Sequence, residues 1–301
     1  MPNNQGFPVI RRLGVDDLKS CAALSVDRGW WPERGKWALL LSESEAYGID
    51  APDGEGMAAS VVLTRWGTDR AAIGMMLVAS RFGGMGLGRA LMEHALGAAG
   101  EDTAVSLFAT DSGRPLYDKL GFKPVRRSVA FRGHFRADPQ ASGGKKSEAR
   151  ARHQPAGTPG NVRVATEADL PAILTLDRAA YGADRERILT RMPGFADRIL
   201  LFETGEGIVG YAAAWRTEAF LMIGPLVAPD GQAARCLVTE LAAGSPVAIR
   251  LDLDPDRPEL PGWARSCGLL ATERTVAMTR GGVAARGIPE LVYTPISVAM
   301  A

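Results

Sequence analysis

Hydrophobic and polar residues along the chain follow the pattern of short apolar strands separated by amphipathic helices. In the first half, strands are predicted at 57–65, 70–78 and 104–109, with a helix at 87–96. The second half repeats this order, with strands at 207–215, 219–227 and 247–253 and a helix at 233–242. The pattern predicts an internal duplication with a period of about 140 residues. Each copy is then an α/β unit, in which helices flank a mixed twisted sheet.

A segment of different composition separates the two copies. Residues 137–160 are rich in Pro, Gly, Ser and basic residues and have no apolar periodicity. Such a segment buries too little surface to offset the entropy of ordering it, so we predict a flexible linker. The predicted domains are therefore 1–136 and 161–301, which agrees with a length of 301 residues. The basic residues of the linker have no aromatic neighbours to stack on bases, which favours a solvated linker over a nucleic-acid arm.

Composition narrows the class of protein. A net charge of +1 gives no electrostatic attraction to nucleic acid or an anionic membrane. The first residues lack a secretory pattern, and no window of about 18 apolar residues occurs. The three cysteines lack CxxC spacing, and His94, His134 and His153 lack metal-ligand spacing. We therefore expect a cytoplasmic monomer or homodimer that holds no metal and binds neither nucleic acid nor membrane.

A glycine-rich turn, Arg81-Phe82-Gly83-Gly84-Met85-Gly86-Leu87-Gly88, joins the strand at 70–78 to the helix that follows. Glycines let an anion approach the backbone, and a helix start presents free N–H groups and the positive end of its dipole. No Gly-Lys-Ser/Thr follows as in a P-loop, and the spacing is not the GxGxxG of a dinucleotide fold. The turn predicts a phosphate site. The alternative is a turn that needs glycine only for its geometry.

A second motif follows the next strand. Residues 112–122, Ser-Gly-Arg-Pro-Leu-Tyr-Asp-Lys-Leu-Gly-Phe, contain a predicted short amphipathic helix that ends with Gly121. Together the two motifs resemble the GNAT superfamily (Gcn5-related N-acetyltransferases) over residues 7–135. The resemblance implies that the chain is an N-acetyltransferase. It would use acetyl-CoA, or another acyl-CoA, and transfer the acyl group directly to a small-molecule or peptide amine in a ternary complex.

The resemblance also implies roles for individual residues. The coenzyme pyrophosphate would lie on the turn amides, and its pantetheine arm in a splay between strands 73–78 and 105–109. Tyr117 would be the catalytic general acid that protonates the leaving thiolate, although its residue type alone fits an aromatic core position. The implied coenzyme-binding residues are Met76, Leu77, Val78, Arg81, Gly83, Gly84, Met85, Gly86, Leu87, Gly88, Arg89, Thr110 and Arg114.

Some positions depart from the family pattern. Gly83 stands where members usually carry Arg or Gln, and Thr110 where many have Asn. The strand at 71–78 has no carboxylate to act as general base. Three alternatives stay open: a water relay, a base from elsewhere such as Asp111, Glu33 or Glu43, or an acceptor amine that enters unprotonated.

Two segments are candidates for the acceptor pocket. Trp30, Trp31 and Trp37 are expected to stack on an aromatic or cationic substrate, the alternative being a packing cluster. Asp184 and Arg185 belong to an element that resembles one in the second domain of tandem GNAT proteins. They are expected at the domain interface, the alternative being an internal ion pair at a helix boundary.

The second copy is predicted to be a degenerate GNAT domain. Its counterpart of the glycine-rich turn carries Asp230, whose carboxylate would repel a pyrophosphate. Trp263 or Ala264 stands at the position of Tyr117. We therefore expect one coenzyme per chain. The alternative function is a non-catalytic acyl-CoA-binding sensor or regulatory protein.

Overall fold

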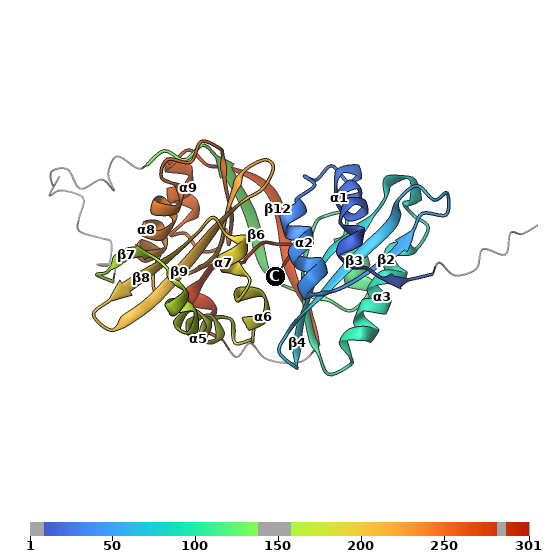
Figure 1. Cartoon of the computed structure of the whole chain (residues 1–301), viewed down its shortest axis with the longest axis horizontal. Coiled ribbons are helices and arrows are strands. Elements are labelled where there is room, and N and C mark those ends of the chain that lie inside the picture. The colour runs from blue at the N-terminus through green and yellow to red at the C-terminus, as the bar shows by residue number, and fades with distance from the viewer. Residues whose placement is uncertain (1–8, 138–157, 282–286, 301) are drawn as a thin grey trace, which may run out of the picture.

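The computed structural model describes residues 9–137, 158–281 and 287–300, which form two lobes side by side (Figure 1). Residues 138–157 of the predicted linker, His153 among them, lie outside the described residues. One sheet runs through both lobes, in the order β1-β2-β3-β4-β5-β12-β6-β11-β10-β9-β8-β7. A further strand, β13, pairs with β10.

The first half supplies the elements from β1 to β6. Its strands are β1 (Arg11–Arg12), β2 (Glu45–Asp50), β3 (Met57–Trp66), β4 (Arg70–Val78), β5 (Ala104–Ala109) and β6 (Lys123–Gly133). Its helices are α1 (Leu18–Asp27), α2 (Arg34–Glu43), α3 (Leu87–Ala99) and α4 (Arg114–Lys119), with short 3₁₀ turns η1 (Val15–Asp17) and η2 (Ser80–Phe82).

The second half repeats this order. Its strands are β7 (Asn161–Val164), β8 (Arg198–Thr204), β9 (Gly207–Arg216), β10 (Leu221–Val227), β11 (Ile249–Leu253), β12 (Leu270–Arg280) and β13 (Val292–Thr294). Its helices are α5 (Leu170–Tyr181), α6 (Glu186–Leu189), α7 (Met192–Phe195), α8 (Gly231–Ala242) and α9 (Pro261–Ser266), with the 3₁₀ turns η3 (Glu167–Asp169) and η4 (Pro289–Leu291).

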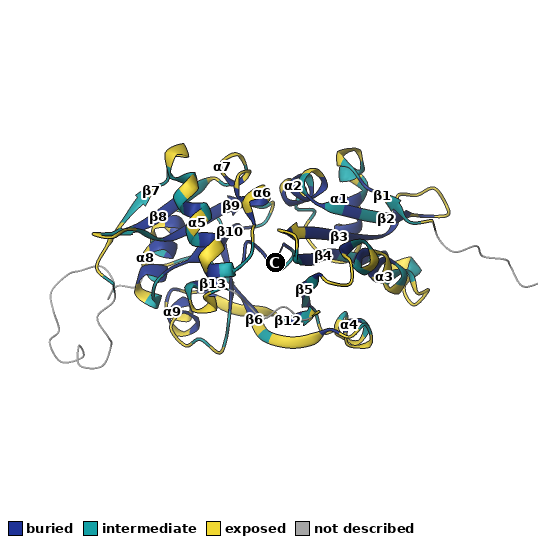
Figure 2. Ribbon diagram, turned by 90° about the horizontal axis from the view of Figure 1, so that it is seen from below, coloured by how far each residue is buried: buried dark blue, intermediate teal, exposed yellow. Residues whose placement is uncertain are grey.

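The two halves exchange a strand. β12 of the second half pairs with β5 of the first, from Val276↔Ala109 to Arg280↔Val105. β6 of the first half pairs with β11 of the second, from Ile249↔Gly133 to Leu253↔Val129. β6 and β12 also pair with each other, and they cross between the lobes with exposed stretches at 123–125 and 270–274 (Figure 2). The sheet is therefore continuous across the duplication.

Helices cover both faces of the sheet in each half. In the first half α3 packs on one face, over Ile73 of β4 and Leu107 of β5. α1 and α2 pack on the other face, where Trp37 and Leu40 share a core with Trp215 of the second half. Because one apolar core contains residues of both halves, burial of that surface holds the lobes together.

In the described part of the chain, no helix combines the length and the apolar character needed to cross a bilayer.

Candidate functional site

β4 and β5 lie side by side for only part of their length. They pair in parallel from Arg70↔Ala104 to Ile73↔Leu107, and beyond Ile73 the register pairs end. β4 is bulged at this point: its register against β3 shifts, and Met75 has a φ of 48°. The carbonyl of Met75 accepts a hydrogen bond of 3.0 Å from the buried Ser60 hydroxyl. A bulge redirects the backbone, and after Ile73 the edge of β4 is no longer in register with β5. We call the interval between the two strands beyond this point the slot.

The glycine-rich turn lies between the end of β4 and α3. Gly84 and Gly86 have φ values of 78° and 82°, a region that favours glycine. Gly86 is the N-cap of α3 and provides no side-chain hydrogen bond, so the first-turn amides of α3 are left for another acceptor. Gly88 has a different role, because a Cβ there would stand 3.0 Å from Cε of Met76. The first two glycines shape an exposed turn, and the third lets α3 pack against β4.

The basic residues around the turn have partners of their own. Arg81 donates to the Glu55 carbonyl at 2.8 Å and to Asp53 at 3.3 Å, so its guanidinium is directed to the loop before β3. Arg89, in the first turn of α3, donates to Glu93 at 2.8 Å, and Arg114, at the start of α4, lies 3.7 Å from Asp118. The ion pairs of Arg89 and Arg114 are exposed and join residues one helical turn apart. Breaking such a pair costs little free energy, so either arginine could give up its carboxylate partner for a phosphate.

Tyr117 lies on the α3 side of the sheet, in α4. Its side chain is buried among apolar residues that include Met76 and Val78 of β4, and it contacts Phe122 edge-on with ring centroids 6.0 Å apart. Burial raises the pKa of the phenol to about 12. Thr110 sets the start of α4, because its hydroxyl accepts from the Gly113 N–H at 3.3 Å. Tyr117 thus shares an apolar cluster with the splayed part of β4, and burial disfavours ionisation of its phenol.

In the second half the corresponding slot is filled by the chain itself. β10 and β11 pair only at Leu221↔Ile249 and Met222↔Arg250. Beyond that point β13 lies against β10, with Leu226↔Thr294 and Val227↔Val292 in register. The Tyr181 hydroxyl donates to the Thr294 carbonyl at 3.1 Å, which fixes β13 in place.

The helix start of the second half is also occupied. Asp230 is the N-cap of α8, and its carboxylate accepts from the amides of Gln232 at 2.9 Å and Ala233 at 2.8 Å. The helix α9 shows which residue replaces Tyr117. Leu269 N–H donates to the Ala264 carbonyl at 2.9 Å, as Phe122 N–H donates to the Tyr117 carbonyl at 3.0 Å. Ala264, not Trp263, is thus the equivalent residue, and it has no proton to donate.

Two family models match the chain, one on each half. An acetyltransferase (GNAT) family model matches residues 16–122, and an acetyltransferase (GNAT) domain model matches residues 173–294. The chain belongs to the GNAT acetyltransferases. It carries two GNAT domains in tandem, as the sequence predicts.

The chain is similar to several known proteins. An uncharacterised N-acetyltransferase of Bacillus subtilis, YitH, is 27% identical over 233 residues, which cover 76% of this chain and 77% of that protein. The solved structure of a Pyrococcus horikoshii protein covers 100% of this chain and 99% of its own, with a TM-score of 0.77 at 16% identity. A tandem GNAT protein from the clavulanic acid biosynthesis pathway covers 92% of this chain and 100% of its own, with a TM-score of 0.63 at 15% identity. The two structures support the fold.

The tryptophan-rich segment divides into exposed and buried residues. Trp30 and Trp31, in the loop between α1 and α2, are 41% and 49% exposed. Asp27 of α1 accepts from the Ser80 N–H at 2.6 Å, which ties this loop to the 3₁₀ turn after β4. Trp37 is fully buried in α2 and donates to the Ser25 hydroxyl at 2.9 Å. Trp37 thus belongs to the packed core of the GNAT fold, and only the other two present surface to a ligand.

The carboxylates named as possible bases are mostly engaged in ion pairs. Glu43 of α2 pairs with Arg187 at 3.2 Å and Arg191 at 2.9 Å, both from the second half. Glu33 contacts the buried ammonium of Lys36. Asp111 is exposed in the turn before α4. Glu43 and Glu33 are thus tied into the interface around α2, and the geometry favours none of the three as a base.

Asp184 and Arg185 lie at the interface, beside the hairpin that joins β3 to β4. A Cβ on Gly67 would stand 3.5 Å from Cβ of Asp184. Arg185 is buried, pairs with Asp177 at 3.0 Å and stacks over Tyr181 at 3.3 Å from the ring centroid. The hairpin is at the opposite end of β4 from the slot, so the structure places these residues at the interface and away from Tyr117.

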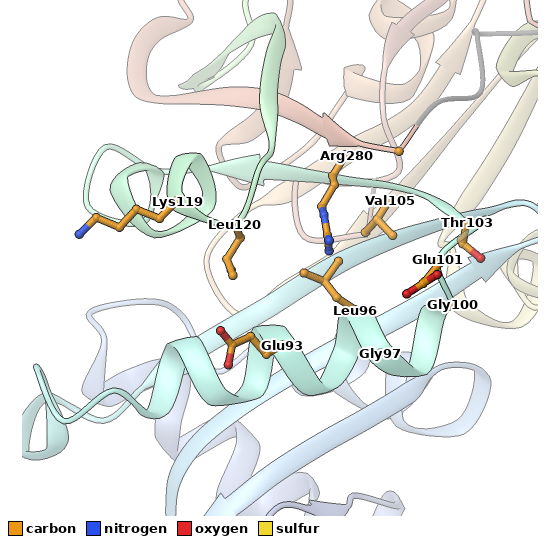
Figure 3. A pocket seen from close by; sticks show the side chains of 11 residues that line it. Glu93, Leu96, Gly97, Gly100, Glu101, Thr103, Val105, Lys119, Leu120 and Arg280 are labelled. Carbon is orange, nitrogen blue, oxygen red and sulfur yellow. The ribbon is translucent and has the colours of Figure 1, made fainter.

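Two cavities among the described residues lie away from this site. One of about 680 Å³ is formed at the C-terminal end of α3, between Glu93, Lys119 and Arg280 (Figure 3). A second of about 380 Å³ lies in the second half, and its lining includes Met192 and Tyr211. Neither is lined by the glycine-rich turn or by Tyr117.

Proposed function

We propose that the first GNAT domain transfers an acyl group, in the first instance acetyl, from acyl-CoA to a primary amine in a ternary complex. The observation that carries the proposal is the slot after Ile73, bounded by the uncapped start of α3 and by Tyr117. Among the described residues, the second domain has the same slot filled and the same helix start capped. One acyl-CoA per chain is the expected stoichiometry.

The residues around the slot fit a coenzyme with a pyrophosphate. Gly83, Gly84, Met85 and Gly86 are exposed, so the backbone of the turn is accessible to an anion. The first amides of α3 and the positive end of its dipole stabilise negative charge at the same point. Arg89 and Arg114 stand at the starts of the two helices that flank this site, where each can exchange its local carboxylate for a phosphate. The free edge of β4 at Met76–Val78 offers backbone groups to an extended arm.

The chemistry follows from the same groups. The bound thioester supplies the acyl group. A neutral amine attacks the carbonyl carbon, the C–N bond forms, the extra proton of the nitrogen passes to water, and the C–S bond breaks so that coenzyme A leaves as a thiolate. A backbone N–H of Met76–Val78 stabilises the negative charge that develops on the carbonyl oxygen. Tyr117 holds its proton beside the sulfur and donates it as the C–S bond breaks. With a pKa of about 12 in the empty site, the phenol of Tyr117 is a weaker acid than an ordinary tyrosine. It therefore first donates a hydrogen bond to the sulfur, and the proton is transferred as negative charge builds up there.

The experiment is a turnover assay with acetyl-CoA and a panel of primary amines, in which free thiol and acetylated amine are measured together. The proposal expects both products in equal amounts. A thermal-shift titration with acetyl-CoA accompanies the assay. A shift without turnover of any amine would support a binding-only sensor. No shift at millimolar acetyl-CoA would contradict both functions.

A further inference from the structure

The segment after β13, Pro295–Met300, connects the filled slot of the second domain to the open slot of the first. It begins on Gly224 of β10, where a Cβ would overlap the carbonyl oxygens of Pro295 and Ile296. It ends on Gly74 of β4, where a Cβ would overlap the carbonyl oxygen of Ala299. The chain therefore passes across both equivalent strands and ends between the lobes (Figures 1 and 2).

Gly74 is the residue that follows the last β4–β5 register pair, Ile73↔Leu107. Its neighbours show which face it presents. Ala71 and Ile73 pack with α3 and Tyr117, whereas Ala72 and Leu77 pack with α1 and α2. Residues alternate between faces along a strand, so Gly74 presents the α1–α2 face, where it meets Ala299. The segment thus covers the opening of the slot on the face opposite the glycine-rich turn.

The segment is fixed by buried side chains at both of its ends. Ile296 and Met300 are 0% and 1% exposed and belong to the core that contains Trp37 and Trp66 of the first domain. Ser297 is also buried, whereas Val298 and Ala299 are only partly buried. Two apolar anchors make the segment a permanent part of the structure, unlike a plug that leaves when a ligand arrives.

We infer that Pro295–Met300 is a fixed wall of the acceptor site and that Val298 and Ala299 determine which amines reach the thioester. The inference rests on the proposed function. If the coenzyme lies along α3 and α4, it occupies the α3 face of the sheet. The amine must then approach from the α1–α2 face, which is where this segment lies. The second domain thus contributes to the specificity of the first without binding a coenzyme itself.

Proximity labelling tests the wall without knowledge of the acceptor. Val298→Cys and Ala299→Cys variants are treated with bromoacetyl-CoA, which carries an alkylating carbon where acetyl-CoA carries its methyl group. Val298 and Ala299 are the two central residues of a turn, closed by a 3.0 Å hydrogen bond from the Met300 N–H to the Ser297 carbonyl, so their side chains leave the turn in different directions. We expect one of the two cysteines to be alkylated, with loss of bromide, at a rate that saturates with reagent concentration and is suppressed by excess acetyl-CoA, which has no free thiol to consume the reagent. The exposed native Cys236 is the internal control, and its labelling should show neither saturation nor suppression.

The outcomes separate the inference from the proposed function. If neither cysteine is labelled faster than Cys236 while coenzyme A still stabilises the protein, the wall is wrong and the coenzyme site stands. If acetyl-CoA neither binds nor protects, the proposed function fails and the inference fails with it.

A second variant tests specificity in turnover. Gly74→Ala pushes the segment away from β4, and we expect the ratio of kcat/KM for ethylamine and tryptamine to change about 10-fold. Coenzyme A affinity should remain unchanged. Gly133→Ala is the matched control, because its Cβ would overlap the Gly268 carbonyl in the exchanged strands, away from the segment. An equal loss with both amines, or the same change in Gly133→Ala, would overturn the inference.

Discussion

The two domains share a topology but treat the slot between their parallel strands in opposite ways. In the first domain β4 and β5 part after Ile73, and the start of α3 has no side-chain cap. In the second, β13 fills the slot and the Asp230 carboxylate binds the first amides of α8. Under the proposed function, groups of the chain itself satisfy in the second domain the backbone donors that an acyl-CoA would satisfy in the first. The second repeat would then keep the fold with its ligand replaced by the chain.

The largest expected effect concerns two buried polar residues, one in the first long helix of each domain. Asp177 in α5 and Ser25 in α1 occupy the same place, counted from Leu170 and Leu18. Asp177→Asn leaves buried Arg185 without its counter-charge. We therefore expect the free energy of unfolding, measured by urea denaturation, to fall by about 3–5 kcal/mol. Ser25→Ala removes only a neutral acceptor for Trp37 and should cost about 1–3 kcal/mol. Equal losses in the two variants would show that the charged pair matters no more than the neutral one.

Tyr117→Phe should lower kcat about 100- to 1000-fold, because the leaving thiolate loses its donor. The affinity for coenzyme A should not change. Burial raises the pKa of Tyr117 to about 12, and the required form is the protonated one. The wild-type rate should therefore show no fall from ionisation of this phenol as the pH rises to about 10. Tyr47→Phe is the control, because the Tyr47 hydroxyl donates to Glu45 on β2. Full activity in Tyr117→Phe would refute the role of Tyr117 as general acid.

Gly86→Asp transfers the cap of the second domain to the first. A carboxylate at the start of α3 would compete with the pyrophosphate, so we expect the Kd of coenzyme A to rise about 100-fold, or by about 2.7 kcal/mol. Gly86→Asn has the same shape without the charge, and its effect should be below about 10-fold. Calorimetric titration of both variants checks this. If Asp and Asn behave alike, backbone geometry rather than charge explains the loss.

The smallest effect should come from the reverse change. Asp230→Ala removes the N-cap of α8 and should cost about 1 kcal/mol of stability. It should not create a second coenzyme site, because β13 still fills the slot between β10 and β11. Thermal unfolding gives the first quantity and equilibrium dialysis with coenzyme A the second. Two coenzymes bound by this variant would show that the cap alone closes the second site.

Local patterns in the sequence predict the individual elements well. The strand Ala104–Ala109 and the helix start at Leu87 lie where the alternation and the glycine-rich turn place them. The exact correspondence between residues of the two copies is harder to predict from sequence. The pattern allows either Trp263 or Ala264 as the equivalent of Tyr117, and the hydrogen bond from the Leu269 N–H identifies Ala264.

Pairing between strands that are distant in the sequence cannot be predicted from local patterns. β6 and β12 have the same apolar alternation whether or not they exchange, so only the pairing itself reveals that each joins the other domain. The residue type of Trp37 does not distinguish a substrate contact from a core position, because both suit a large ring. The segment Pro295–Met300 has no periodicity to mark it, and its place on Gly74 follows from the folded chain alone.

The most direct test of the contrast between the domains is the stoichiometry of coenzyme A binding, measured by isothermal titration of the wild type and of Gly86→Asp. The account predicts one coenzyme per wild-type chain and a large loss of affinity in the variant. Two coenzymes per wild-type chain, or one bound with undiminished affinity by Gly86→Asp, would contradict it.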